Sequence, residues 1–497
     1  MKVHLVFAPP NIKSRIAPVW RAALPPLGVL YLAAYLRQAL PDLDIRVTDG
    51  LLQGPGKTVD EIRVFGPDVL CISFYTGSAL GAYDLAVKAK DACPGIWVIA
   101  GGPHATAVPA DVLSRSPIDV VVRGEGELTL VDLIATLARN RGLSPDALRH
   151  QLGIAYREVD GMVRVTPPRP YIQHLDDIPF PAWDLLPMGD YRGYHLCRQS
   201  PEYPILFSRG CPHDCVFCPN EHWNLTKPKV RYRSPKNVVD EMEQLVRDYG
   251  IREFNNLSDE LNNHPALAPA ICEELKRRRL GITWKTMLRA DHVSETLVRA
   301  MAESGCWMAS LGIETGNPTT MRGIKKHFSH KQVEDACRLL KKYGLKVQGY
   351  FMLFHVWEES GNLCFEDCDA TRNTVRYAES LFSAGLLDYM GWSVTMPYPS
   401  SELYQIALRH HLIKPELQGQ WDDWGQSALC VMALPGVAED EQTRVVRQAR
   451  TLGAKASLLR RGIRMADLPM MARTALQTVG TEVRLTMNRL TMRPGGS

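Results

Sequence analysis

The chain has 497 residues, of which 45% are hydrophobic and 23% charged, a composition ordinary for a globular protein. This length exceeds the size at which one hydrophobic core usually stops growing, so two or three domains are expected. The sequence contains no run of about eighteen apolar residues, which argues against a membrane span. A net charge of +4 is too small for this length to indicate a nucleic-acid partner.

Residues 1–140 alternate short β-branched runs with segments of helical periodicity. The runs are VHLVFA, DIRVTD, DVLCISFY, IWVIAGG and DVVVRGEGE. The first run is too short for the apolar region of a signal peptide and is interpreted as a strand. The alternation predicts an α/β domain with a flavodoxin-like, doubly wound parallel sheet that has helices on both faces.

Three further regions follow. Residues 141–200 contain QHLDDIPFPAWDLLP, whose prolines and turn residues interrupt any regular period, and are interpreted as a linker. Residues 201–400 are predicted to form a partial (β/α)6 barrel, with strands at ILFSRGC, EFNNLSDE, ITWKTMLRA, WMASLGIET, LKVQGYFMLF and YMGWSVTMPYP. Residues 401–497 lose the strand signals and are expected to form a mostly helical C-terminal region.

Three of the twelve cysteines, Cys211, Cys215 and Cys218, crowd together directly after the first strand pattern of the barrel. Loops in this position carry the chemistry of barrel enzymes, and three thiolates can hold three irons of a cubane and leave the fourth open. The alternative of a structural zinc normally requires four ligands in paired spacings, and Cys364 and Cys368 offer a CxxxC without a third partner. The remaining cysteines are too scattered for a disulfide scaffold, so a metal site in a reducing compartment, the cytoplasm, is expected.

The spacing CxxxCxxC, with Phe217 before the last cysteine, resembles the signature of the radical S-adenosylmethionine (SAM) superfamily. The resemblance implies a [4Fe–4S] cluster on the three cysteines, whose open iron chelates SAM near Phe217. Polar residues at the ends of later strands are then expected to hold SAM, although each alone could form an ordinary ion pair at the barrel rim. The expected SAM contacts are Phe217, Ser258, Asp259, Glu260, Arg289, Gly312 and Glu314.

The first domain resembles the cobalamin-binding domain that precedes the radical SAM core in one large subfamily. Glycines at strand ends let the backbone approach a bulky cofactor at the crevice of a doubly wound sheet, although such glycines also occur in simple βα turns. The cobalamin contacts that the resemblance implies are Leu27, Gly28, Asp49, Ser73, Tyr75, Thr76, Ser78, Gly101, Gly102, His104, Gly124 and Glu125.

One departure from related cobalamin domains affects the cobalt. The Asp-x-His-x-x-Gly motif of methionine-synthase-type domains, whose histidine ligates the metal, does not occur in this chain. The resemblance therefore implies cobalamin with its base off the cobalt and with Tyr75 and Thr76 near the lower face of the corrin. His104 is expected to be a polar contact on the side of the nucleotide tail.

Together the two resemblances imply a cobalamin-dependent radical SAM methyltransferase that methylates an unactivated carbon of a small metabolite or natural product. One SAM would yield a 5′-deoxyadenosyl radical and a second would recharge cobalamin, with electrons from a donor such as flavodoxin or ferredoxin. Aromatic walls with a few polar groups are typical of small-molecule pockets. The substrate is therefore expected near Tyr350, Trp392, Thr395, Tyr398 and the stretch Trp421, Asp422, Asp423 and Trp424.

Three other functions remain open. A cobalamin-dependent cyclase or rearrangement enzyme would share the same motifs, so the mass of the product decides between it and a methyltransferase. A radical SAM methylthiotransferase would carry three cysteines in its first domain, where this chain has only Cys71 and Cys93, and a C-terminal β-barrel. A cobalamin or redox sensor would not consume SAM, and the polar residues of the expected SAM site argue against it.

Overall fold

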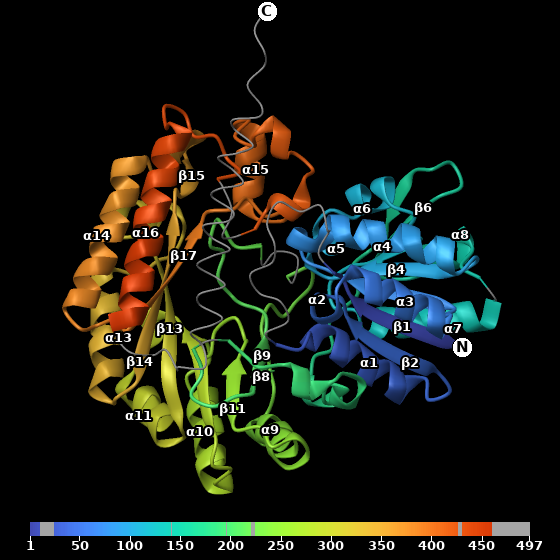
Figure 1. Ribbon diagram of the computed structural model, residues 1–497, viewed down its shortest axis with the longest axis horizontal. Helices are drawn as coiled ribbons and strands as arrows, with labels where there is room; N and C mark the ends of the chain where they lie inside the picture. Colours follow the sequence, from blue (N-terminus) through green and yellow to red (C-terminus); the bar gives the residue numbers. More distant parts are fainter. Residues whose placement is uncertain (10–23, 141, 195, 220–223, 426–429, 460–497) are drawn as a thin grey trace, which may run out of the picture.

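The computed structural model describes residues 1–9, 24–140, 142–194, 196–219, 224–425 and 430–459. Two lobes lie side by side, each built around its own β-sheet (Figure 1). The first lobe, blue to cyan, contains the N-terminal residues. The second lobe, green to red, contains the cysteine loop and the last described helix.

The sheet of the first lobe has seven strands, and its central part is parallel. The five parallel strands lie in the order β2-β1-β3-β4-β5, which confirms the predicted flavodoxin-like sheet. β1 is buried along almost its whole length, as expected for a strand that is covered on both faces. The strands are β1 (Lys2–Phe7), β2 (Asp44–Asp49), β3 (Val69–Ser73), β4 (Trp97–Gly101), β5 (Val120–Val122), β6 (Ile154–Arg157) and β7 (Val163–Val165).

Residues 141–200 do not begin as a plain linker. β6 pairs antiparallel with β5, and β7 pairs antiparallel with β6, so this segment extends the first sheet. Ile154, Ala155 and Tyr156 are fully buried, and this short apolar run was hidden among polar neighbours in the sequence. The rest of the segment has only short 3₁₀ turns, η2 (Leu175–Asp177), η3 (Trp183–Leu185) and η4 (Met188–Asp190).

The sheet of the second lobe has six parallel strands, in the order β17-β14-β13-β12-β11-β8. All six strands expected from the sequence are present, and they confirm the partial barrel. They are β8 (Glu202–Ile205), β11 (Glu253–Asn256), β12 (Thr283–Leu288), β13 (Cys306–Glu314), β14 (Lys346–Leu353) and β17 (Tyr389–Val394). Two small antiparallel pairs were not predicted: β9 (Ser208–Arg209) with β10 (Arg231–Tyr232), and β15 (Val356–Glu359) with β16 (Asn362–Phe365).

Helices cover both sheets, as the sequence predicted. In the first lobe they are α1 (Leu27–Ala39), α2 (Gly50–Gln53), α3 (Pro55–Phe65), α4 (Ala79–Ala92), α5 (Pro103–Ala107), α6 (Pro109–Arg115), α7 (Glu127–Asn140) and α8 (Pro145–Arg149). In the second lobe they are α9 (Pro235–Tyr249), α10 (Leu267–Arg278), α11 (Glu295–Glu303), α12 (Pro318–Gly323), α13 (His330–Lys342), α14 (Cys368–Ser383), α15 (Glu402–Arg409) and α16 (Glu439–Leu459). Among the described helices, none combines the length and the apolar character needed to cross a bilayer.

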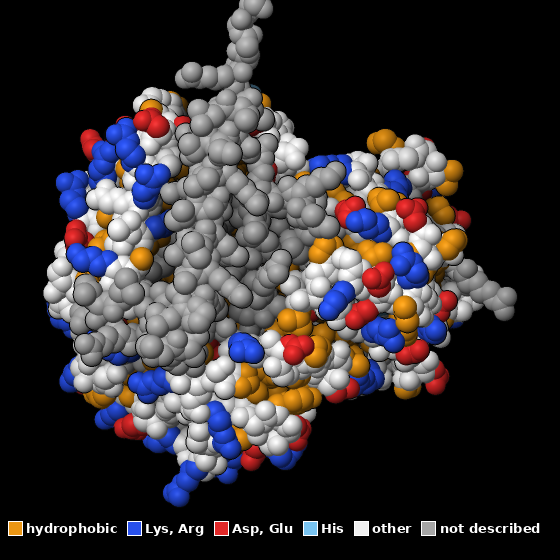
Figure 2. Space-filling view, viewed as in Figure 1, with side chains coloured by type: hydrophobic (Ala, Val, Ile, Leu, Met, Phe, Trp, Pro, Cys, Tyr) orange, Lys and Arg blue, Asp and Glu red, His pale blue; other side chains and the backbone are white. Residues whose placement is uncertain are grey.

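Alternate residues of the first sheet face two different cores. Leu5 belongs to a core that includes α1 and α7 and continues into the barrel. Val6 faces the opposite core, which is formed by α4 and α6 and also contains Trp421 and Trp424 of the C-terminal region. In the described part of residues 401–497, the turn η8 (Trp421–Asp423) thus packs on the first lobe, while α15 packs against β15 and α16 against β17. On the face drawn in Figure 2, acidic and basic side chains are interspersed over both lobes.

Candidate active site between the two sheets

A cavity of about 1520 Å³ lies between the two sheets. The first lobe contributes the carboxyl ends of β1, β3, β4 and β5, where the crossovers of a doubly wound sheet leave a crevice. The second lobe contributes inward-facing residues of β11, β12, β13, β14 and β17. The volume exceeds the range of about 300–1,000 Å³ that is usual for one small ligand, so the cavity has room for more than one.

Most of the residues expected to contact cobalamin line this cavity. The lining members are Leu27, Gly28, Asp49, Ser73, Tyr75, Thr76, Gly101, Gly102, Gly124 and Glu125. Ser78 and His104 do not reach its surface in the described part of the chain. Tyr75 is 58% exposed, a large value for an aromatic side chain, and it projects from the end of β3 into the cavity. The crevice is therefore built largely from the strand ends that the sequence singled out.

Two glycines leave open space at the cavity wall. A Cβ atom on Gly28 or Gly77 would meet no other atom within 4 Å, so any side chain there would occupy the cavity itself. Gly102 is required for a different reason: its φ is +92°, and a Cβ atom would lie 2.8 Å from the carbonyl oxygen of Phe74. This cradle fits a bulky group that lies close to the backbone.

His104 lies behind the cavity wall in a buried hydrogen-bond network. Its Nδ1 is 3.2 Å from Thr76 Oγ1, and its Nε2 is 3.3 Å from the Tyr83 hydroxyl. Tyr83 also donates to Asp111 over 3.0 Å, and Trp421 Nε1 donates to the same carboxylate over 2.8 Å. Burial lowers the pKa of His104 to about 4, so the ring is neutral at pH 7. His104 therefore supports Thr76, which does line the cavity.

The three cysteines lie on the loop that follows β9. Cys211 is buried, Cys215 and Cys218 are half-buried, and the Cys218 amide donates to the Cys215 carbonyl over 3.0 Å. Burial raises the pKa of Cys211 to about 12 and also raises that of Cys215. All twelve cysteines lie in the described part of the chain, and none of them forms a disulfide there. Gly210 and Pro219, the residues directly before Cys211 and directly after Cys218, line the cavity.

Several residues expected to hold SAM gather beside Cys215. Lys326 Nζ is 3.0 Å from Glu314 Oε1 and 5.9 Å from the centre of the Phe217 ring. Arg289 is buried, pairs with Asp291 over 2.8 Å and donates to the Lys326 carbonyl. Among the groups around Cys215, both Lys326 and Arg289 act to lower its pKa. The sequence interpretation missed Lys326, because nothing local marks it as a partner of Glu314.

The three residues after β11 have different surroundings. Ser258 Oγ accepts hydrogen bonds from the amides of Phe207 and Ser208 over 2.8 and 3.0 Å. Its hydroxyl is therefore already engaged by the backbone between β8 and β9. Asp259 lines the cavity, and burial together with the neighbouring Glu260 raises its pKa. Glu260 Oε2 lies 3.2 Å from His213 Nε2. One ligand atom each of Cys211, His213 and Glu260 lies within 4.8 Å of the others, so these residues could hold a single metal ion.

The residues expected near the substrate are split by the structure. Tyr350, Trp392, Tyr398, Asp422 and Trp424 line the cavity. Thr395, Trp421 and Asp423 do not reach it among the described residues, and Trp421 packs against the His104 ring at 5.0 Å between centroids. The sequence interpretation missed the polar lining residues Tyr194, Lys285, Ser310 and Gln348. Only the inward alternation of β12, β13 and β14 could have indicated the last three, and Tyr194 lies in the irregular segment before β8.

Two arginines that flank the cysteine loop, Arg209 and Arg231, bind Glu125 and Glu127 of the first lobe. Glu125 was expected to contact cobalamin and does line the cavity. Burial would raise the pKa of Glu125, but hydrogen bonds from Arg231 and the charge of Arg209 outweigh it and hold the pKa below its usual value. The two lobes are thus joined by buried ion pairs next to the candidate site.

Two family models match the chain. Residues 19–134 match the B12 binding domain, and residues 205–360 match the Radical SAM superfamily. An uncharacterized methyltransferase of Pyrococcus horikoshii is 34% identical over 421 residues, which are 83% of this chain and 84% of the relative. The anaerobic magnesium-protoporphyrin IX monomethyl ester cyclase of Rubrivivax gelatinosus is 30% identical over 81% of this chain and 70% of its own.

A solved structure has the same fold at low identity. The radical SAM methyltransferase TsrM of Kitasatospora setae, with cobalamin and a [4Fe–4S] cluster bound, aligns with a TM-score of 0.66 at 17% identity, over 94% of this chain and 89% of its own. The order of the two matched domains agrees with the two lobes and with the cavity between them. The chain therefore belongs to the cobalamin-dependent radical SAM enzymes, in which a B12-binding domain precedes a radical SAM domain.

Proposed function

We propose that this protein is a cobalamin-dependent radical SAM methyltransferase that acts on an unactivated carbon of a small metabolite or natural product. One observation carries the proposal: the glycine-lined strand ends of the first sheet and the two residues that flank the cysteines, Gly210 and Pro219, line the same cavity. A nucleophilic acceptor would need neither a radical nor a cluster, so the pairing of both sites points to carbon that lacks a reactive lone pair.

Within this proposal, Cys211, Cys215 and Cys218 hold the cluster, and Lys326 and Arg289 offset its negative charge. When both cofactors are bound, the cluster would supply the electron that cleaves SAM, and cobalamin would supply the methyl group. Phe217, Asp259 and Glu314 orient SAM, and they exclude water together with the buried residues around them.

In the first lobe, we assign the cobalamin cradle to Gly28, Gly77, Gly101 and Gly102, with Tyr75 and Thr76 at the lower face of the corrin. The open space beside Gly28 and Gly77 supports this assignment, because a bulky cofactor needs direct approach to the backbone. His104 fixes the Thr76 hydroxyl from behind.

The proposal also extends to the domains and partners. Residues 1–140 would carry cobalamin, and residues 201–400 the cluster and SAM. Residues 401–497 would form a mostly helical C-terminal region, of which α16 packs against β17. A cytoplasmic flavodoxin or ferredoxin would supply electrons. The similarity to the methyltransferase of Pyrococcus horikoshii supports methyl transfer, and the similarity to the cyclase of Rubrivivax gelatinosus keeps ring formation as the alternative outcome.

The test uses the holoprotein, SAM with a deuterated methyl group, a chemical reductant, and pooled small-molecule fractions from the source cells. Methyl transfer predicts a product that has gained the labelled methyl group in place of one hydrogen. S-adenosylhomocysteine and 5′-deoxyadenosine should form in equal amounts. Cys215→Ala is the matched control and should form neither deoxyadenosine nor product. Deoxyadenosine that forms in step with an unlabelled product would contradict methyl transfer and favour the cyclase.

A further inference from the structure

A cluster of four buried charges links the lobes at the cysteine loop, and the proposed function leaves it unexplained. We call the set Glu125, Glu127, Arg209 and Arg231 the charge clamp. Arg231 Nη1 donates to Glu125 Oε2 over 2.9 Å, and the other amine of its guanidinium donates to the second oxygen of the same carboxylate. Arg209 Nη1 is 2.7 Å from Glu127 Oε1 and 3.5 Å from Glu125 Oε1. The four side chains are between 4% and 17% exposed.

The two arginines occupy the two ends of the cysteine loop. Arg209 ends β9 just before the loop, and Arg231 begins β10 just after it; the two residues are paired across this ladder. Gly210 has a φ of +90°, and a Cβ atom there would lie 1.9 Å from the Lys229 carbonyl oxygen, so the two strands are pressed together. The loop that carries Cys211, Cys215 and Cys218 therefore leaves and re-enters the fold at one anchored point.

Aromatic residues outside the barrel strands reinforce this anchor. The Arg231 guanidinium lies over the Tyr171 ring at 4.5 Å, and that of Arg209 lies over the Tyr31 ring at 5.0 Å. Tyr171 also accepts a hydrogen bond from the Leu225 amide over 3.0 Å, on the part of the chain that follows Cys218. The end of the loop at Arg209 is thus held by Tyr31 of the first lobe, and the end at Arg231 is held by Tyr171 of the segment that follows that lobe.

Stability alone does not account for such an arrangement. A buried ion pair is often no more stabilising than apolar residues of similar volume, because desolvation offsets the attraction. A bidentate Arg–carboxylate pair does, however, fix orientation as well as distance. Glu125 and Glu127 lie on the segment that follows β5 and border the cavity with Gly124, which was expected to contact cobalamin.

We propose that the charge clamp holds the cluster loop at a fixed position relative to the cobalamin crevice, so that its four members act as positioning residues. The inference rests on the cofactor content of the proposed function and does not depend on which product is formed. Glu125 and Glu127 act through the two arginines on the cysteine loop.

The test measures the distance between two paramagnets in the loaded protein by pulsed electron paramagnetic resonance. Cob(II)alamin and the reduced [4Fe–4S] cluster each carry an unpaired spin, and their dipolar coupling depends steeply on separation. The unaltered protein should give one narrow distance distribution. The double variant Glu125→Gln/Glu127→Gln should give a broader distribution. Arg231→Lys should do the same, because lysine keeps the positive charge but cannot bind both oxygens of Glu125 as the guanidinium does.

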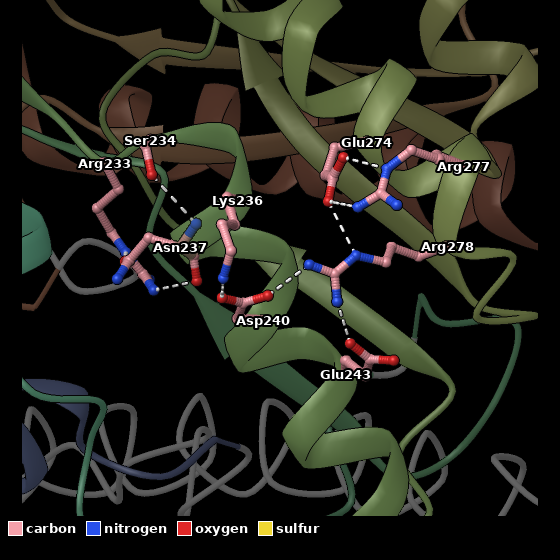
Figure 3. Close-up of polar contacts among 9 residues, drawn as sticks. All are labelled: Arg233, Ser234, Lys236, Asn237, Asp240, Glu243, Glu274, Arg277 and Arg278. Atoms are coloured by element: carbon pink, nitrogen blue, oxygen red, sulfur yellow. Dashed lines mark hydrogen bonds and ion pairs between the residues drawn. The ribbon is translucent and has the colours of Figure 1, made fainter.

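The matched control is Glu274→Gln. Glu274 pairs with Arg277 and Arg278 in an ion-pair network that joins α10 to α9 through Asp240 and Glu243 (Figure 3). Neither helix is part of the cysteine loop. This variant removes the same kind of charge and should keep the narrow distribution. A distribution in the double variant as narrow as that of the unaltered protein would overturn the proposal.

A second measurement tests the charge clamp even in variants that fail to bind a cofactor. Hydrogen exchange of the peptide spanning residues 207–233 can be followed in the cofactor-free proteins, and it should be faster by roughly tenfold or more in the double variant than in the unaltered chain. Equal exchange would overturn the clamp. An unaltered protein that cannot be loaded with both cofactors would instead contradict the proposed function, while the exchange comparison would still decide on the clamp.

Discussion

At the scale of single residues, a buried ion pair between β8 and β12 of the barrel could not be predicted from the sequence. Lys285 Nζ donates to Glu202 Oε2 over 2.8 Å and also to the Leu196 carbonyl. Lys285 is 4% exposed and Glu202 is 0% exposed. Burial raises the pKa of Glu202, and Lys285 opposes this shift. Each group is therefore tolerated in the interior chiefly because the other is present.

Replacing Lys285 with Met should destabilise the protein by about 3–5 kcal/mol, because Glu202 would be left as a buried carboxylate without its cation. Denaturant unfolding at pH 7 measures the loss. The loss should shrink as the pH falls toward the raised pKa of Glu202, since a protonated carboxyl group needs no cation. The double variant Lys285→Met/Glu202→Gln is the control and should recover much of the stability. A double variant less stable than Lys285→Met would show that the pair is not the cause.

At the scale of elements, α16 closes the side of the barrel at β17. Gly453 lies where the helix comes closest: a Cβ atom there would be 2.9 Å from Trp392 Cδ1 and 3.3 Å from the Met390 carbonyl oxygen. Gly453 and Trp392 also line the cavity. The absence of a side chain at this position therefore sets how close the helix lies to the strand.

Gly453→Leu should push α16 away from β17 and cost about 1–3 kcal/mol through overpacking. Thermal unfolding is the measurement. Gly56→Leu in α3 is the matched control, because a Cβ atom at Gly56 meets no atom within 4 Å, and there the better helix former should leave stability unchanged or improve it. Equal stability of the two variants would mean that α16 can shift without cost.

At the scale of the whole molecule, the cavity lies between the lobes, so a ligand that fills it contacts both sheets. Binding to the folded state alone stabilises a protein by mass action. Cobalamin should therefore raise the unfolding temperature, and the stabilisation should grow with the logarithm of the ratio of free cobalamin to its dissociation constant. The open space beside Gly28 makes this position a clean probe of the crevice.

Gly28→Phe should fill part of the crevice and abolish cobalamin binding, while the cofactor-free protein keeps its unfolding temperature, because Gly28 lines the cavity and a Cβ atom there meets no atom within 4 Å. Visible absorbance after gel filtration, together with the thermal shift on adding cobalamin, measures the effect. Gly56→Phe, on α3 and outside the cavity lining, should bind cobalamin normally. Retained binding in Gly28→Phe would move the cobalamin site elsewhere.

The sequence by itself determined the order of the strands, the two lobes and the cysteine loop, because these follow from local periodicity and short spacings. Most of the residues that the family resemblance named for cobalamin, such as Gly28, Tyr75 and Gly101, do line the crevice. β6 was missed because its apolar run is short and lies among turn residues.

Tertiary structure alone decided which distant groups meet. Arg231 pairs with Glu125 across 106 positions, and Lys285 pairs with Glu202 across 83 positions. No local pattern marks such partners, because the choice depends on how separate elements pack and on which charges that packing buries together. His104 shows the same limit: its type suggested a contact in the cavity, while burial and hydrogen bonds placed it behind Thr76.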